Sequence, residues 1–181
     1  MNLIRRFIQN NRGSAVVELA LAFPVLMLLG FGGFELTRYI LIQQKISKTV
    51  SSMSDLVARS PTISATELTA MFQAVPHLMD PYNRPDDMVV IISSVVNYGS
   101  GPVVAWQRRG GGNITTASRV GVQGGAATLP AGFTLATNEN TIVSEMYYSF
   151  RPVVAPNVVG RSTNYKAKYN MPRLGALDVL R

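Results

Sequence analysis

The residues best placed to do chemistry in this chain are Gly13 and Glu18, at the start of a long apolar stretch. Residues 1–13 contain three arginines and no acidic residue, and residues 14–34 contain a single charged side chain, Glu18. An ionised carboxylate inside an apolar segment costs free energy unless a cation or a hydrogen-bond donor compensates it. The pattern therefore predicts a processing and assembly signal, in which the backbone is cut at a small residue and a carboxylate requires a partner.

Glu18 has two kinds of partner within reach. Because it lies about one helical turn inside the apolar segment, its side chain can extend to the headgroup layer or to Arg12. Alternatively, hydrolysis of the peptide bond after Gly13 exposes a new α-amino group on Ser14 and makes Glu18 the fifth residue of the shortened chain. In a stack of parallel helices, the amine of one copy then neutralises the Glu18 carboxylate of its neighbour.

The composition leaves little material for catalysis or for a metal centre. The chain has no cysteine and one histidine, His77, which disfavours thiolate sites, histidine clusters and Ser-His-Asp triads. We expect His77 to be a half-buried or capping side chain near a helix end, and Asp80, Asp86 and Asp87 to cap and solvate a turn. Residues 110–112 are glycines without a phosphate-loop motif, so a flexible loop is expected there. We expect no enzymatic activity, no cofactor and no metal.

The net charge does not indicate a nucleic-acid partner. Seventeen basic and ten acidic residues give a formal charge of +7, but three of the basic residues are the leader arginines Arg5, Arg6 and Arg12. The other basic residues are scattered between Arg38 and Arg181 without a dense run, whereas nucleic-acid-binding surfaces concentrate them. We therefore expect no nucleic-acid binding.

Residues 14–34 have the length and composition of a membrane-spanning helix. As an α-helix they rise about 31 Å, close to the ~30 Å hydrocarbon core of a bilayer, and residues 19–34 are uncharged. A cleaved signal peptide is the alternative, but the Ala-x-Ala triplet at residues 20–22 lies in the middle of the apolar run instead of after it. The lipid bilayer is therefore an expected partner, crossed once.

The charges that flank this segment do not orient it. Three arginines precede it, and three basic residues follow it, namely Arg38, Lys45 and Lys48. Because the two numbers are equal, the positive-inside rule favours neither orientation. A short N-terminal tail and a long C-terminal region favour a cytoplasmic N-terminus, because long domains translocate largely regardless of their charge.

The helical pattern continues beyond the apolar segment. Apolar residues recur there at steps of three or four and mark one face, while polar and charged residues occupy the remaining positions. This face consists of Tyr39, Ile42, Ile46, Val50, Met53 and Val57. One helix is therefore expected over residues 14–58, with a transmembrane half and an amphipathic half.

Pro24 and three glycines modify this helix. Pro24 removes one backbone hydrogen bond and is expected to kink the helix within the membrane. Gly30, Gly32 and Gly33 either form a smooth surface that another helix can approach closely or loosen the helix where it leaves the lipid. The sequence favours neither of these two interpretations.

Residues 11–24, NRGSAVVELALAFP, closely resemble the start of TadE-like proteins, the minor pilins or pseudopilins of the tight-adherence (Flp, type IVc) pilus system. The shared pattern is a basic leader, a G-x-A-x-x-E core, a short apolar run and an early proline. The resemblance extends over about residues 5–48. It implies a pilin-like plan in which a long N-terminal helix carries a small globular domain.

The resemblance also implies a function and partners. A TadE-like minor pilin would be cut after Gly13 by an aspartyl prepilin peptidase of the bacterial inner membrane, with Glu18 as the assembly residue. Its other partners would be further pilins and the Tad inner-membrane assembly platform. Its C-terminal domain would be periplasmic, or extracellular once assembled into a thin adhesive pilus. A membrane-tethered adhesin or assembly partner that does not polymerise, and a tethered enzyme or ligand-binding module, are the alternatives.

The region after the long helix is expected to form a small α+β domain. A capping box at Ser64 and Glu67 starts a short helix over residues 65–74, which Pro76 ends. Apolar, β-branched runs predict an antiparallel sheet of three or four strands packed on the long helix. The predicted strands cover residues 88–97, 103–107 and 141–150, the last with a candidate extension at residues 153–154.

Three regions are thus expected, a basic leader at residues 1–13, the helix at residues 14–58 and an α+β domain at residues 59–181. The glycine-rich loops within residues 108–132 have no assigned role. The basic tail at residues 161–181 either contacts a phosphate surface or acidic partner or forms a solvated, partly ordered edge, and the second interpretation is favoured.

Overall fold

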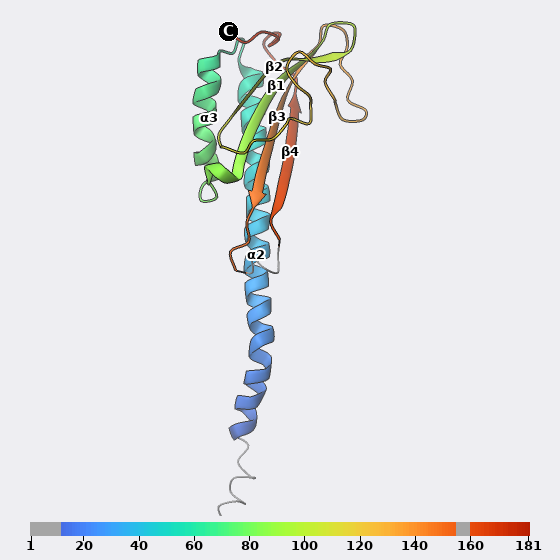
Figure 1. The fold of residues 1–181 in the computed structure, drawn as a ribbon. Helices are drawn as coiled ribbons and strands as arrows, with labels where there is room; N and C mark the ends of the chain where they lie inside the picture. The colour runs from blue at the N-terminus through green and yellow to red at the C-terminus, as the bar shows by residue number, and fades with distance from the viewer. Residues whose placement is uncertain (1–11, 155–159) are drawn as a thin grey trace, which may run out of the picture.

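The computed structural model describes residues 12–154 and 160–181, and of residues 12–14 it describes the backbone alone. It shows a long helix whose C-terminal half carries a small α+β domain (Figure 1). The elements are α2 (Arg12–Arg59), α3 (Ala65–Met79), the 3₁₀ turn η1 (Pro85–Asp87), β1 (Met88–Asn97), β2 (Pro102–Gly110), β3 (Asn140–Phe150) and β4 (Ser162–Asn170).

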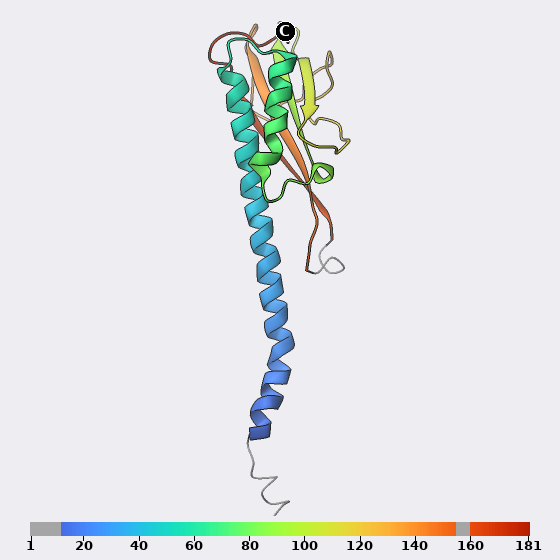
Figure 2. The ribbon, with the colours of Figure 1, turned by 90° about the vertical axis from the view of Figure 1, so that its left-hand side faces the viewer.

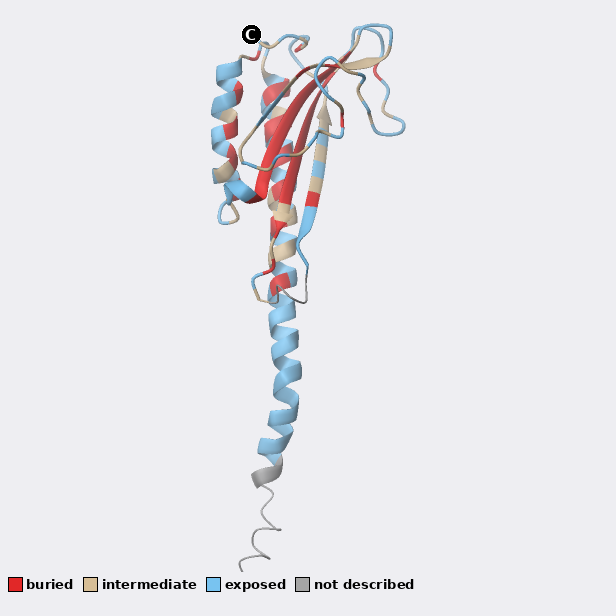
Figure 3. Ribbon diagram, viewed as in Figure 1, coloured by how far each residue is buried: buried red, intermediate tan, exposed pale blue. Residues whose placement is uncertain are grey.

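The helix α2 is continuous over 48 residues and runs through Pro24. Every side chain in residues 15–34 is exposed, and burial begins only where the helix reaches the domain (Figure 3). Beyond that point the predicted apolar face packs against the sheet. Ile42, Ile46, Val50, Met53 and Val57 are at most 2% exposed, and Tyr39 is partly buried. The prediction of an amphipathic second half is therefore confirmed.

The helix α3 extends beyond its predicted end. The capping box is present, since the Ser64 hydroxyl accepts a hydrogen bond from the Glu67 backbone N–H at 3.2 Å and Glu67 Oε2 accepts one from the Ser64 N–H at 2.8 Å. The helix continues to Met79, so the expectation that Pro76 ends it is wrong. Val75 and Met79 are buried on either side of Pro76, and their packing outweighs the loss of one backbone hydrogen bond.

The four strands form one antiparallel sheet in the order β2-β1-β3-β4, which confirms the predicted α+β class. The helix α2 lies across one face of this sheet, with α3 beside it, and long loops lie across the other face (Figures 1 and 2). Val120 and Leu135 of these loops pack on Val95, Val104 and Val143 of the strands. Because both faces are covered, β1 and β3 are buried along nearly their whole length and read as continuous apolar runs.

The C-terminal tail is more ordered than the sequence indicated. Residues 162–170 form the edge strand β4, and Leu177 is 1% exposed in the core. The Leu177 carbonyl accepts hydrogen bonds from Trp106 Nε1 at 2.8 Å and from Ser94 Oγ at 2.7 Å. The expectation of a solvated edge is thus wrong for the chain around Leu177, because two buried donors in the sheet require an acceptor.

The glycines at residues 110–112 lie in close packing and do not form a flexible loop. A Cβ atom on Gly110 would lie 2.4 Å from Phe72 Cγ, and one on Gly112 would lie 2.0 Å from the Met88 carbonyl oxygen. Only hydrogen fits at these positions, so the chain can pass directly against α3 and β1. The flexible-loop expectation is therefore wrong for this run.

Candidate functional site

The predicted cleavage and assembly residues lie in the first two turns of α2. The backbone of Gly13 and Ser14 is helical, and Glu18 follows about 6 Å further along the helix axis. The side chain of Glu18 is exposed among apolar neighbours. Residues 1–11 of the leader lie outside the described residues, and so do the side chains of Arg12 and Ser14.

The apolar half of α2 surrounds Glu18 with exposed hydrophobic side chains. Val17, Leu19 and Leu21 are 59–73% exposed, and the pattern continues to Phe34. A helix that is apolar on all sides is stable in lipid or among other apolar helices, and not in water. Among the described residues, α2 is the one helix long and apolar enough to cross a membrane, which indicates a single-pass anchor.

Glu35, a residue that the sequence analysis did not single out, lies where α2 leaves its apolar half. Its side chain is 6% exposed, and Oε2 accepts hydrogen bonds from the backbone N–H groups of Val153 and Val154, both at 3.0 Å. Arg38 donates to Oε1 at 2.7 Å. Burial raises the pKa of Glu35, but the two N–H groups and Arg38 outweigh it and hold that pKa below its ordinary value.

This arrangement corrects the predicted strand extension. β3 ends at Phe150, and the N–H groups of Val153 and Val154 bond to Glu35 and not to a neighbouring strand. The only local signal was an acidic residue directly after the apolar segment. Arg38 is only three residues away, but Val153 and Val154 lie more than a hundred residues away in sequence, so no spacing rule could identify these two partners.

Further contacts fix α2 to the sheet one turn beyond Glu35. Tyr39 Oη and Gln43 Nε2 both donate hydrogen bonds to Asn164 Oδ1, at 3.0 and 2.6 Å. The Tyr39 ring meets Phe150 edge to face, with 5.2 Å between the ring centroids. Polar and aromatic contacts therefore hold the domain in one orientation on the helix close to its exposed half.

A buried carboxylate on the outer face of the sheet holds one of the covering loops. Glu145 is fully buried and accepts hydrogen bonds from Ser118 Oγ, from the Arg119 backbone N–H at 2.9 Å and from Tyr165 Oη at 2.9 Å. The Arg119 guanidinium lies over the Tyr165 ring, 4.1 Å from its centroid. All these donors come from the fold itself, so Glu145 stabilises the loop.

The remaining predicted site residues lie apart from one another. His77 is exposed in the last turn of α3. Asp80 and Asp86 accept hydrogen bonds from nearby asparagines, as expected of a solvated turn. Asp87 instead is 2% exposed and pairs with Arg151 at 2.5 Å, so the solvation expectation is wrong for Asp87. Within the described part of the chain, no three His, Asp or Glu side chains are grouped to hold a metal ion.

The comparison with protein families matches the N-terminal part of α2. Residues 13–52 match a family model described as TadE, TadE-like protein. The match includes the predicted cleavage position, the apolar segment and the first part of the amphipathic half, and it confirms the resemblance seen in residues 11–24. It associates the chain with the Tad pilus machinery. Neither the curated proteins nor the solved structures contain a match to this chain.

Proposed function

We propose that this TadE-like, Tad pilus-associated chain is a minor pilin or pseudopilin that a prepilin peptidase cuts after Gly13 and that enters or primes a Flp-type pilus. The observation that carries the proposal is the form of α2. Its apolar half is wholly exposed, its second half is fixed to the domain, and Gly13 and Glu18 lie at its far end. Such a helix has a surface that is stable in lipid before assembly and against other apolar helices after it.

Cleavage would create a new cation with which the Glu18 carboxylate of a neighbouring copy can pair. The new amine would be on Ser14, about 6 Å along the axis from Glu18. A parallel neighbour displaced by about one helical turn would therefore bring its own amine level with this carboxylate. Pairing of the two charges lowers the cost of keeping either of them within an apolar contact.

The proposal includes a location and a set of partners. Before assembly the N-terminus is cytoplasmic and the domain is periplasmic, with α2 crossing the inner membrane once. The prepilin peptidase, other pilins and the Tad assembly platform would all act on α2, and the domain would become extracellular after assembly. The chain itself would have a structural role and no catalytic activity.

The mature N-terminus tests the cleavage step. Peptide sequencing of the membrane and pilus fractions should find Ser14 as the first residue. An intact Met1, or a cut near Gly33, would contradict the proposal. Processed chain that is confined to the membrane fraction would instead favour a tethered adhesin or assembly partner that does not polymerise.

The variant Glu18→Ala tests assembly separately from cleavage. We expect normal processing but at least a tenfold lower amount in the pilus fraction, because the neighbour's amine loses its partner. Leu19→Ala is the matched control, since it shortens an adjacent exposed side chain without removing a charge. Undiminished incorporation of Glu18→Ala would leave this residue without an assembly role.

A further inference from the structure

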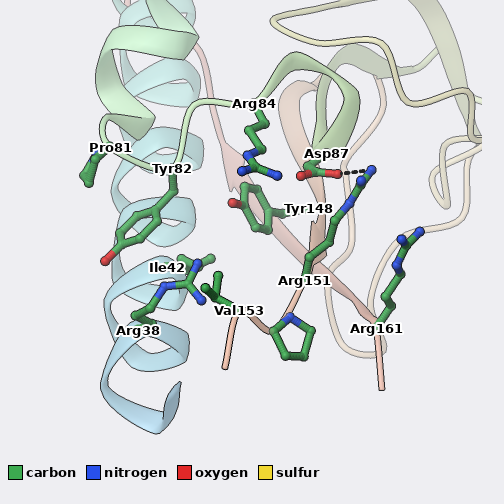
Figure 4. Close-up of a pocket in the computed structure, with 11 residues that line it drawn as sticks. Arg38, Ile42, Pro81, Tyr82, Arg84, Asp87, Tyr148, Arg151, Val153 and Arg161 are labelled. Atoms are coloured by element: carbon green, nitrogen blue, oxygen red, sulfur yellow. Dashed lines mark ion pairs between the residues drawn. The ribbon is translucent and has the colours of Figure 1, made fainter. Parts of the chain in front are cut away.

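A basic pocket opens between the domain and the part of α2 that follows the apolar half. It has a volume of about 400 Å³ and is lined by α2, by the connection between α3 and β1, and by the adjoining ends of β3 and β4. Four arginines line it, and they come from different parts of the chain (Figure 4). These are Arg38, Arg84, Arg151 and Arg161.

Two of these arginines are neutralised within the fold and two are not. Arg38 pairs with Glu35 at 2.7 Å, and Arg151 pairs with Asp87 at 2.5 Å. Arg84 and Arg161 are exposed, and the guanidinium group of neither makes an ion pair or hydrogen bond with another described residue. Figure 4 shows them on either side of the Asp87–Arg151 pair. The pocket therefore carries two positive charges that a ligand could neutralise.

If the hydrocarbon core ends at Phe34, the Arg38 side of the pocket is at the level of the lipid headgroups and the Ile42 side is just beyond them. Arg38 and Ile42 line it from α2 and follow Phe34 by four and eight residues, which is about 6 and 12 Å along the helix axis. The headgroup layer extends roughly 5–8 Å beyond each side of the hydrocarbon core. The chain after β3 reaches along α2 toward the exposed half (Figure 1), and Arg151 and Val153 of this segment line the pocket.

The lining suits a phosphate group attached to an apolar body. Guanidinium groups donate paired hydrogen bonds to phosphate oxygens. The Tyr148 hydroxyl is protonated at neutral pH, as an ordinary tyrosine is, and burial raises its pKa further, so it has a proton to donate. Ile42 and Val153 supply apolar surface beside these donors.

We propose that this pocket binds the phosphodiester headgroup of an anionic phospholipid, with Arg84 and Arg161 as its principal cations. Bound lipid would link the α3–β1 connection to the start of β4 and seat the domain on the membrane next to its own helix. The proposal rests on the membrane anchoring of α2 and is independent of cleavage after Gly13 and of assembly through Glu18.

The test uses the full-length chain in a neutral detergent. Phosphatidylglycerol and phosphatidylcholine are added in separate titrations, and native mass spectrometry measures the fraction of protein that retains lipid. We expect the wild-type chain to prefer phosphatidylglycerol. The double variant Arg84→Gln/Arg161→Gln should weaken this binding roughly tenfold or more, since each basic residue near an anionic surface contributes several-fold.

The matched control is Lys166→Gln/Lys168→Gln on β4. It removes the same number of charges from exposed side chains outside the pocket, and we expect it to change phosphatidylglycerol binding less than twofold. The fluorescence of the buried Trp106 reports whether each variant is folded. Both variants should still begin at Ser14 in cells, so failure of lipid binding can be distinguished from failure of the minor-pilin proposal.

Four outcomes would overturn the proposal. An equal loss in the lysine control would indicate diffuse surface charge, and equal retention of both lipids would remove the preference for an anionic headgroup. Displacement of the lipid by an equimolar amount of inorganic phosphate would indicate a site for free phosphate. The fourth outcome combines two results. Photoreactive phosphatidylglycerol labels the chain outside the pocket, and cross-linking in native membranes joins the pocket to an acidic protein. Together these results would indicate a protein partner.

Discussion

At the scale of single residues, two carboxylates on α2 have different surroundings. Glu18 is exposed on the apolar half, whereas Glu35 is buried at the junction and accepts hydrogen bonds from Val153, Val154 and Arg38. Arg38 comes from α2 itself, whereas Val153 and Val154 come from the chain after β3, so their bonds to Glu35 fix that chain to the helix. Glu35 is therefore a structural residue, while the assembly role of Glu18 stays a prediction.

Replacing Glu35 by glutamine should lower the stability of the folded domain and change its pH dependence. Because the pKa of Glu35 is lower in the folded state than in the unfolded chain, its contribution is present above about pH 4.5 and is lost as the pH falls through the folded pKa. At neutral pH we expect a loss of about 1–2 kcal/mol in the free energy of unfolding. Below about pH 4.5 the difference in the free energy of unfolding between Glu35→Gln and the wild type should become smaller.

Urea unfolding of the full chain in neutral detergent, followed by Trp106 fluorescence at several pH values, measures this effect. Asp178→Asn is the control, because the Asp178 carboxylate makes no hydrogen bond or ion pair with the described residues. Stability curves for Glu35→Gln that coincide with the wild type would show that the junction does not depend on the Glu35 charge.

Gly112 illustrates a requirement for space at a single position. In Gly112→Ala the new methyl group would meet the Met88 carbonyl oxygen at 2.0 Å, so the backbone must move. We expect destabilisation of roughly 1–3 kcal/mol or more, as is typical of overpacking. Gly160→Ala is the control, because no atom of the other described residues lies within 4 Å of its Cβ position. If the thermal unfolding midpoints of the two variants agree, the close contact at Gly112 does not affect the stability of the domain.

At the scale of elements, α2 is one helix with two environments. Residues 15–34 are exposed on all sides, whereas the second half buries a continuous apolar face beneath the sheet. Both halves are α-helical, but the side chains of the first half are uncovered whereas one face of the second half is covered by the sheet. Side chains of the same class should therefore contribute to the stability of the domain in one half and not in the other.

Truncation of Ile46 and of Leu21 should show that the two halves of α2 contribute differently to the stability of the domain. Ile46 is fully buried, and Ile46→Ala should cost about 2–5 kcal/mol in domain stability because it leaves a cavity. Leu21 is 73% exposed, and Leu21→Ala should change domain stability by less than about 0.5 kcal/mol. Urea unfolding in neutral detergent with Trp106 fluorescence compares the two variants. Equal losses would mean that the apolar half is coupled to the folding of the domain.

At the scale of the whole molecule, the fold places a rigid domain at a defined height above an apolar anchor. Glu35 and Tyr39 tie α2 to the chain after β3 and to Asn164 of β4, so the domain cannot swing freely about the end of the apolar half. The basic pocket lies at the same level. Before assembly, this arrangement is the one expected of a domain whose residues 14–34 are inserted in a membrane.

A positive charge within that segment should therefore prevent stable anchoring. Leu26 and Leu36 are similarly exposed, at 57% and 59%, but only Leu26 lies within the apolar half. Leu26→Arg should lower insertion by about 2.5–3.5 kcal/mol, whereas Leu36→Arg can place its charge in the headgroup layer. Alkaline carbonate extraction of membranes should release Leu26→Arg and retain Leu36→Arg. Release of both variants, or of neither, would contradict the proposed boundary of the anchor.

The sequence by itself determined the features that depend on near neighbours. The continuity of α2 and its buried face follow from apolar spacing at three and four residues, and the start of α3 follows from the capping box at Ser64 and Glu67. The strands β1 and β3 follow from β-branched apolar runs. The match of residues 13–52 to TadE-like proteins also lies in this local pattern.

Only the tertiary structure decided the features whose partners are distant in sequence. Burial of Val75 and Met79 carries α3 past Pro76, and the close contact with Met88 determines why residue 112 is glycine. The junction at Glu35 and the basic pocket join residues from separate elements. Their partners meet only when the sheet folds onto α2, because packing and charge pairing depend on distance in space and leave no periodic signal along the chain.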